Sequence, residues 1–178
     1  MQDILANMPG SLSVKRDPVA LGRFSQQSVN FTSTPHIAIA EPADLQSLRE
    51  LVLWANANKC PLIPVSSSAG ARGQGEATSS TRPAIIVDMS GMKRIVNVDG
   101  RDAIAVIEPG VTFPEFDSAL KSYGLRSFKP LLPRRNKSVL TSYLDREPTT
   151  SPHDHWDSED PLGGMQVVFG SGELFRTG

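Results

Sequence analysis

The clearest periodic pattern in the chain lies between residues 42 and 59. Apolar side chains recur there at three- and four-residue steps and form one face of an amphipathic helix: Leu45, Leu48, Leu51, Val52 and Ala55. Pro42 suits the first turn of this helix, and Pro61 cannot continue it. Short apolar runs at 35–40 and 62–65 flank the helix. The order strand, helix, strand predicts a βαβ unit with a parallel strand pair.

Beyond this unit the pattern changes to short strands separated by turns. Asp99-Gly100, between two alternating segments, is typical of a hairpin turn, and Gly170-Ser171-Gly172 predicts a closing hairpin. Residues 113–123 have helical periodicity and end at Gly124, while a shorter helix is predicted near 138–144. The remaining strands are predicted at 84–89, 94–98, 103–107, 165–169 and 173–176.

Composition narrows the class of protein. Of the 178 residues, 39% are hydrophobic and 21% are charged, which is typical of a globular domain. The formal net charge of -1 gives no electrostatic reason to bind nucleic acid or an anionic membrane. Cys60 is the single cysteine, so an intrachain disulfide is impossible and a buried structural thiol is the better interpretation. Without an apolar run of roughly 18 residues or a signal peptide, we expect a cytoplasmic protein.

The segment from Ser66 to Gly75 is the strongest candidate for a ligand-binding loop. It follows a predicted strand and contains three consecutive serines and three glycines. Small residues let backbone amides curl around an anion, and serine hydroxyls add donors, so a pyrophosphate is the natural ligand. Gly75 is followed by Glu76 rather than by Lys-Ser, and the glycine spacing differs from the Rossmann fingerprint. A flexible surface loop is the alternative interpretation.

Four segments in order resemble the FAD-binding half of the vanillyl-alcohol oxidase and p-cresol methylhydroxylase superfamily: 64–70, 85–95, 106–112 and 164–178, the last ending in Arg-Thr-Gly. The resemblance implies an α+β FAD-binding domain over residues 1–178. Its small parallel βαβ subdomain is expected at about 1–89, and its larger, mostly antiparallel sheet with helices at about 90–178. In the family a substrate-binding cap domain follows this point. We therefore expect a truncated chain, or one subunit of a split enzyme.

The resemblance also implies which residues contact FAD. The serine and glycine loop would hold the pyrophosphate through Ser66, Ser67, Ser68, Ala69, Gly70 and Ala71. The Glu-Pro-Gly-Val turn would bring Gly110 and Val111 to the cofactor, and the proline-rich stretch that includes Pro130 and Ser138 would pass the flavin ring. The loop lacks the histidine that some relatives use to bond the flavin, so we expect non-covalent FAD. The stretch 133–139 also lacks the Gly-Gly pair usual in glycolate- and lactate-oxidising members.

Two further clusters carry candidate chemistry. Residues 152–157 group two histidines with two aspartates, for which a solvated loop is favoured over a metal site. The resemblance offers a third role, in which Asp154, His155 or Asp157 lies near the flavin and takes a proton during catalysis. The basic cluster of Arg134, Arg135 and Lys137 is either a solvated turn or a partner for phosphate or substrate carboxylate.

The resemblance implies an oxidoreductase that oxidises an alcohol or 2-hydroxy acid, glycolate-, lactate- or aryl-alcohol-like, by hydride transfer to FAD. Expected partners are a small-molecule substrate, a cap-domain or electron-transfer subunit, and a second copy of the chain, because an uncovered edge strand at 174–176 invites pairing. The alternative is a non-catalytic flavin- or nucleotide-binding module that serves as an assembly subunit. A reductase of the cell-wall precursor pathway, which shares the fold, is a third option.

Overall fold

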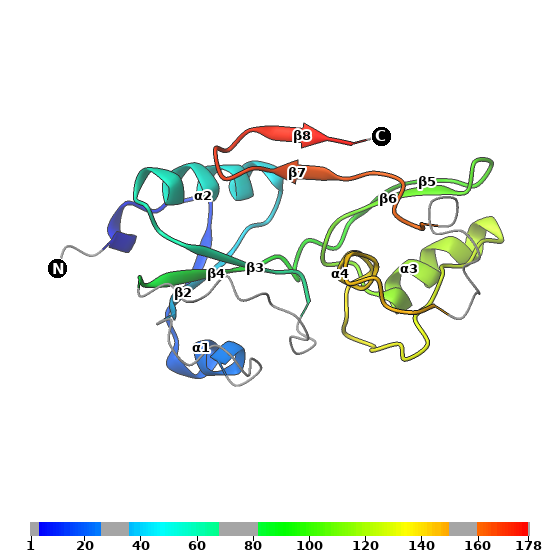
Figure 1. The fold of residues 1–178 in the computed structure, drawn as a ribbon, viewed down its shortest axis with the longest axis horizontal. Coiled ribbons are helices and arrows are strands. Elements are labelled where there is room, and N and C mark those ends of the chain that lie inside the picture. The colour runs from blue at the N-terminus through cyan, green and yellow to red at the C-terminus, as the bar shows by residue number, and fades with distance from the viewer. Residues whose placement is uncertain (1–3, 26–35, 68–81, 150–159, 178) are drawn as a thin grey trace.

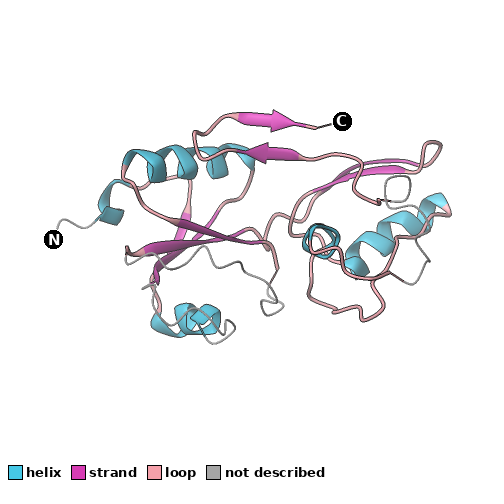
Figure 2. Ribbon diagram, in the orientation of Figure 1, coloured by secondary structure: helices cyan, strands magenta, loops and turns pink. Residues whose placement is uncertain are grey.

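The computed structural model describes residues 4–25, 36–67, 82–149 and 160–177 (Figure 1). Helices and strands both occur in the described parts of the chain, as Figure 2 shows by colour. Together with the mixed sheet described next, they confirm the α+β class. In order the elements are η1 (Ile4–Asn7), β1 (Ser13–Lys15), α1 (Pro18–Ser25), β2 (His36–Glu41), α2 (Leu45–Ala57), β3 (Leu62–Val65), β4 (Ala84–Asp88), β5 (Ile95–Asp99), β6 (Ile104–Ile107), α3 (Phe113–Leu120), η2 (Lys121–Tyr123), α4 (Val139–Leu144), β7 (Gln166–Val168) and β8 (Leu174–Arg176).

The first half of the chain builds a four-stranded sheet in the order β1-β2-β4-β3. β2 and β3 both run parallel to β4, and β1 pairs with β2 in the antiparallel direction. The predicted direct pairing of β2 with β3 is therefore wrong, because β4 lies between them. Ala84 to Val87 are all buried, as suits a central strand with both faces covered. Pro64 lacks the N–H that a central strand needs, which suits β3 to the edge.

Helices cover both faces of this sheet (Figure 1). On one face, Leu51 and Trp54 of α2 pack with buried residues of β2 and β4, including Ile85. On the other face, Ile86 forms a cluster with Ile39 and Val65 that partly buried residues of α1 contact. Apolar side chains on both faces of the sheet are therefore covered by helices. The sheet holds the carboxyl end of β3, from which the serine-rich segment departs, at a fixed position.

Helix α2 begins three residues later than predicted. The Asp44 carboxylate accepts a hydrogen bond from the backbone N–H of Ser47 at 2.8 Å, and the Ser47 hydroxyl accepts from the backbone N–H of Asp44 at 3.1 Å. This capping box satisfies the free amides of the first turn, so Asp44 starts the helix. Pro42 lies ahead of the cap and outside the first turn, contrary to the prediction.

The second half contains two separate antiparallel strand pairs, β5–β6 and β7–β8, in the part of the chain that the structure describes. The resemblance implied one larger sheet instead. A second core lies between β5–β6 and the helices, formed by Val111, Phe113, Phe116, Leu120 and Val139. The β7–β8 hairpin runs alongside α2, where Arg49 Nε donates to the Gly172 carbonyl at 2.8 Å (Figure 1). The last hairpin therefore contacts the first half of the chain.

The turn between β5 and β6 forms at the predicted Asp99-Gly100 pair but lies one residue later than the predicted strand ends imply. Four residues, 100–103, connect the strands, and the Asp99 carboxylate accepts from the backbone N–H groups of Arg101 and Asp102 at 2.9 and 3.1 Å. The left-handed conformation falls on Ala103, with φ of 55°. At the end of η2, Gly124 is left-handed as predicted, with φ of 70°. Among the described helices, none combines the length and apolar character needed to cross a membrane.

Candidate functional site

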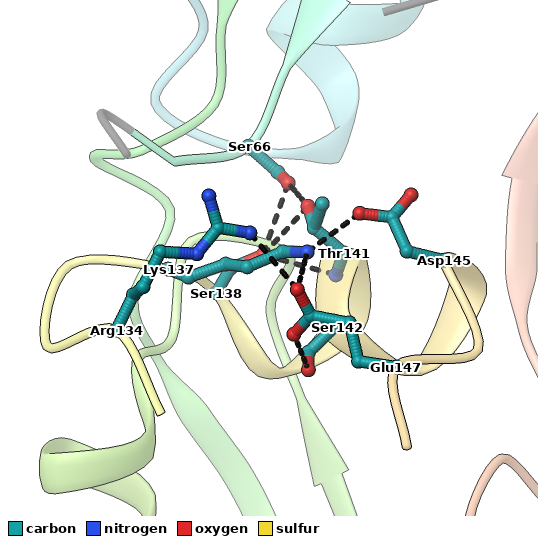
Figure 3. A network of polar contacts seen from close by, with 8 residues as sticks. All are labelled: Ser66, Arg134, Lys137, Ser138, Thr141, Ser142, Asp145 and Glu147. Carbon is teal, nitrogen blue, oxygen red and sulfur yellow. Dashed lines mark hydrogen bonds and ion pairs between the residues drawn. The ribbon is translucent and has the colours of Figure 1, made fainter. Parts of the chain in front are cut away.

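Three hydroxyl groups from two distant parts of the sequence meet where β3 ends (Figure 3). Ser66 directly follows β3, and its Oγ lies 3.0 Å from Ser138 Oγ and in close contact with Thr141 Oγ1. Ser138 Oγ and Thr141 Oγ1 are 2.9 Å apart. Each hydroxyl can donate and accept, so the group, here called the hydroxyl triad, has the chemistry to hold phosphate oxygens.

The sequence places two members of the triad at the start of α4. Ser138 is the N-cap, and its Oγ accepts from the backbone N–H of Thr141 at 3.1 Å. The backbone N–H of Val139 donates to the Val111 carbonyl at 2.9 Å, and Thr112 and Ser138 form an antiparallel bridge. The structure therefore joins Ser66, Val111 and Ser138, three of the residues predicted to contact FAD, into one connected group.

Gly110 lies in the turn before Val111 and is pressed against its own chain. A Cβ at this position would lie 2.6 to 2.7 Å from the carbonyl oxygens of Met89, Ser90 and Met92. Its backbone N–H donates to the Met92 carbonyl at 2.8 Å. Internal packing thus explains why the turn needs glycine, and the predicted approach of Gly110 to the cofactor stays a prediction. Nearby, the buried Glu108 carboxylate accepts from the backbone and side chain of Arg94.

A cluster of paired charges surrounds α4 (Figure 3). Lys137 is 3% exposed, and its Nζ lies 2.6 Å from Asp145 Oδ2 and 2.8 Å from Glu147 Oε1. Arg134 pairs with the same Glu147 oxygen at 2.9 Å, whereas Arg135 is exposed. The interpretation of this basic segment as a solvated turn is therefore wrong for Lys137, whose charge is neutralised inside the chain.

Glu147 stays ionised at the centre of that cluster. Burial opposes its ionisation, but hydrogen bonds from Lys137, Ser142 and Arg134 outweigh burial and hold the pKa of Glu147 below its usual value. Sequence reasoning missed Ser142, Asp145 and Glu147. The signal for them was the placing of two acidic residues just after the predicted helix 138–144 and three basic residues just before it.

The remaining candidates are less connected or lie outside the described residues. Pro130 is buried and forms a bridge with Thr149, away from the contacts of the triad, and Ser67 is partly exposed. Cys60 is partly buried, which raises the pKa of its thiol and agrees with a structural role. The candidates outside the described residues are Ser68, Ala69, Gly70, Ala71, Asp154, His155 and Asp157.

Helix α3, which follows Val111, gives a pH-dependent prediction. Glu115 accepts from the Thr112 backbone N–H and hydroxyl at 2.9 and 2.6 Å and pairs with Lys93 at 2.8 Å. Burial opposes its ionisation, but these bonds outweigh burial and lower its pKa from 4.5 to about 2. The stabilisation is present above pH 4.5 and is lost as the pH falls through 2. We expect Glu115→Gln to cost about 1 kcal/mol of unfolding free energy at pH 7.

Urea unfolding at pH 7 and pH 2.5 checks this expectation. The difference between wild type and Glu115→Gln should shrink at the lower pH, because the wild-type carboxylate is then largely protonated in the unfolded chain and close to protonation in the folded one. Glu173→Gln, at an exposed position in the last hairpin, should change stability by less than about 0.5 kcal/mol. An equal loss for Glu115→Gln at both pH values would contradict the assignment.

Comparison with known proteins gives the family. Residues 36–178 match the family model described as the FAD binding domain, and the chain therefore belongs to this family. It is 26% identical over 153 residues to the 4-cresol dehydrogenase [hydroxylating] flavoprotein subunit of Pseudomonas putida, covering 84% of the chain and 28% of that protein. It is 30% identical over 144 residues to the D-2-hydroxyglutarate dehydrogenase of Stutzerimonas stutzeri, covering 78% and 29%.

A solved structure of p-cresol methylhydroxylase with substrate bound matches the fold. The TM-score is 0.71 at 21% identity, and the match covers 93% of the chain and 32% of that structure. The resemblance inferred from the sequence is confirmed. The chain spans between a quarter and a third of the length of these relatives.

Proposed function

We propose that the chain binds FAD non-covalently and forms the cofactor-holding part of an oxidoreductase acting on an alcohol or a 2-hydroxy acid. The observation that carries this proposal is the hydroxyl triad of Ser66, Ser138 and Thr141, which stands at the start of the serine- and glycine-rich segment. Hydroxyl donors suit the oxygens of a pyrophosphate, so the donor set fits FAD. Bound FAD would supply the acceptor for a hydride.

In this proposal different segments of the chain contact different parts of FAD. Ser66 to Ala71 hold the pyrophosphate through hydroxyl and backbone N–H groups. Ser138 and Thr141 orient the Ser66 hydroxyl through their hydrogen bonds to it. Gly110 and Val111, joined to α4 through the Val139 N–H, lie beside the cofactor. Pro130, which bridges to Thr149 away from the triad, meets the cofactor at a separate point.

The substrate class is supported by the relatives' names. The two curated relatives are named for a cresol and for a 2-hydroxy acid, compounds that carry a hydroxyl group. Oxidation of such a substrate removes a hydride from carbon and a proton from the hydroxyl. We propose Asp154, His155 or Asp157 as the acceptor of that proton.

We also propose a partner that completes the enzyme. The cresol relative is named as a flavoprotein subunit, which supports an assembly in which another polypeptide accepts electrons.

Ser66→Ala is the direct test of the triad. We expect it to weaken FAD binding roughly tenfold, since a hydrogen bond to a charged group contributes about 1.5 to 3 kcal/mol. Ser122→Ala is the matched control, because Ser122 is exposed and its hydroxyl donates to the Ala119 carbonyl one turn earlier. Quenching of FAD fluorescence on titration gives the affinities. Wild-type affinity in a folded Ser66→Ala chain would remove the triad from the site.

Non-covalent attachment is tested separately. After acid precipitation of FAD-loaded protein, we expect all the flavin in the supernatant, because the segment around Ala69, Gly70 and Ala71 contains no histidine or cysteine. A yellow pellet would contradict this and show a covalent bond formed elsewhere in the chain.

A further inference from the structure

The charge cluster around α4 ties together the two ends of this helix. Arg134 and Lys137 precede α4, and Asp145 and Glu147 follow it. The ion pairs between them link the segment before α4 to the segment after it (Figure 3). In α4 itself, the Ser142 hydroxyl donates to Glu147 Oε2 at 2.6 Å. The four charges are balanced, two positive and two negative.

Lys137 is the buried centre of the cluster and the direct neighbour of the triad. Its side chain is 4% exposed, and the next residue, Ser138, is fully buried with its Oγ on Ser66. Burying a lysine costs solvation that an apolar side chain would not lose, and buried ion pairs often contribute little net stability. What such a pair fixes well is geometry, because both carboxylates must keep their places around one ammonium group.

We propose that this cluster is a clamp that holds Ser138 and Thr141 against Ser66, and that Lys137 is thereby a positioning residue for FAD. The inference rests on the proposed function. Without Lys137, Asp145 and Glu147 lose their shared counter-ion and repel each other. The start of α4 is then free to move away from Ser66, and the anion site loses its preorganised hydroxyls.

The test is a double-mutant cycle between Lys137→Met and Ser66→Ala, read as FAD dissociation constants below each variant's unfolding midpoint. Alone, Lys137→Met should weaken FAD binding about tenfold, as Ser66→Ala does. In the Ser66→Ala background it should add less than about threefold, because the hydroxyl that it positions is already gone. Lys93→Met, which breaks an exposed pair with Glu115, is the matched control and should leave affinity unchanged.

A second measurement needs no cofactor. In the FAD-free chain, Lys137→Met should lower hydrogen-exchange protection of the Val139 and Thr141 amides, which bond to Val111 and Ser138, while Lys93→Met should not. Asp145→Asn, which removes only one partner of Lys137, covers the case in which Lys137→Met does not fold, and should act in the same direction by about threefold on FAD affinity.

The outcomes separate the two proposals. A wild-type chain that binds no FAD overturns the proposed function and the cofactor role of Lys137 together, while exchange still reports whether the clamp exists. A wild-type chain that binds FAD, with undiminished affinity in folded Lys137→Met, overturns the clamp alone. An equal loss in both backgrounds also overturns it, because it would show general destabilisation rather than positioning of Ser66.

Discussion

Replacing Gly110 with alanine is expected to lower the free energy of unfolding by about 3 kcal/mol. The new Cβ would lie within 2.7 Å of three backbone carbonyl oxygens, which cannot rotate away as a side chain can. Relief requires that the turn before Val111 move. Because the Val111 carbonyl holds the Val139 N–H, that movement would also shift α4 and weaken FAD binding.

Gly91→Ala is the matched control in the same part of the fold. No heavy atom lies within 4 Å of a Cβ at Gly91, and its φ is not in the left-handed region. This variant should be as stable as wild type or up to about 1 kcal/mol more stable, since alanine restricts the unfolded chain. Urea unfolding of both variants gives the comparison. Equal stability of Gly110→Ala and Gly91→Ala would show that the turn is not packed as described.

Leu51→Ala is expected to cost about 2 to 5 kcal/mol of unfolding free energy. Leu51 is fully buried where α2 packs on the sheet, so its loss removes transfer free energy and leaves a cavity between rigid elements. The same substitution at Leu132, which is 82% exposed, should change stability by less than about 0.5 kcal/mol. A small effect at Leu51 in thermal and urea unfolding would contradict the placing of α2 over β2 and β4.

The elements with strong local patterns could be predicted from the sequence. The α2 helix follows from its apolar face, and η2 ends at Gly124 because glycine enters the left-handed region freely. The last hairpin follows from its glycines, one of which, Gly172, has φ of 81°. In each case a few neighbouring residues decide the conformation, so no distant contact is needed to infer it.

Elements that depend on distant partners could not be predicted. β1 is three residues long and is held by β2, to which Lys15 also pairs through Glu41. Ala20 and Leu21 of helix α1 pack against one face of the sheet, and the short sequence of this helix does not predict that contact. The position of β4 between β2 and β3 likewise depends on which strands pair in the folded sheet. Periodicity shows that β4 is a buried strand but not which strands flank it.

The candidate site divides in the same way. The resemblance picked out Ser66, Val111 and Ser138, and the structure joins them through hydrogen bonds at α4. The ion pairs of Lys137 with Asp145 and Glu147 could not be predicted. They form because the residues that follow the six-residue helix α4 fold back toward the residue that precedes it. A basic cluster considered by itself suggests that it binds an external anion. When the acidic residues that follow the helix are considered with it, the sequence indicates ion pairs within the chain.

The central claim is that the serine-rich loop and the hydroxyl triad hold the pyrophosphate of FAD. Parallel titrations of the 178-residue chain with FAD and with riboflavin, which lacks the pyrophosphate and the adenosine attached to it, test this claim most directly. We expect saturable binding of one FAD per chain and at least roughly hundredfold weaker binding of riboflavin, since several charge-assisted hydrogen bonds depend on the phosphates. Absence of saturable FAD binding, or equal affinity for the two ligands, would contradict it.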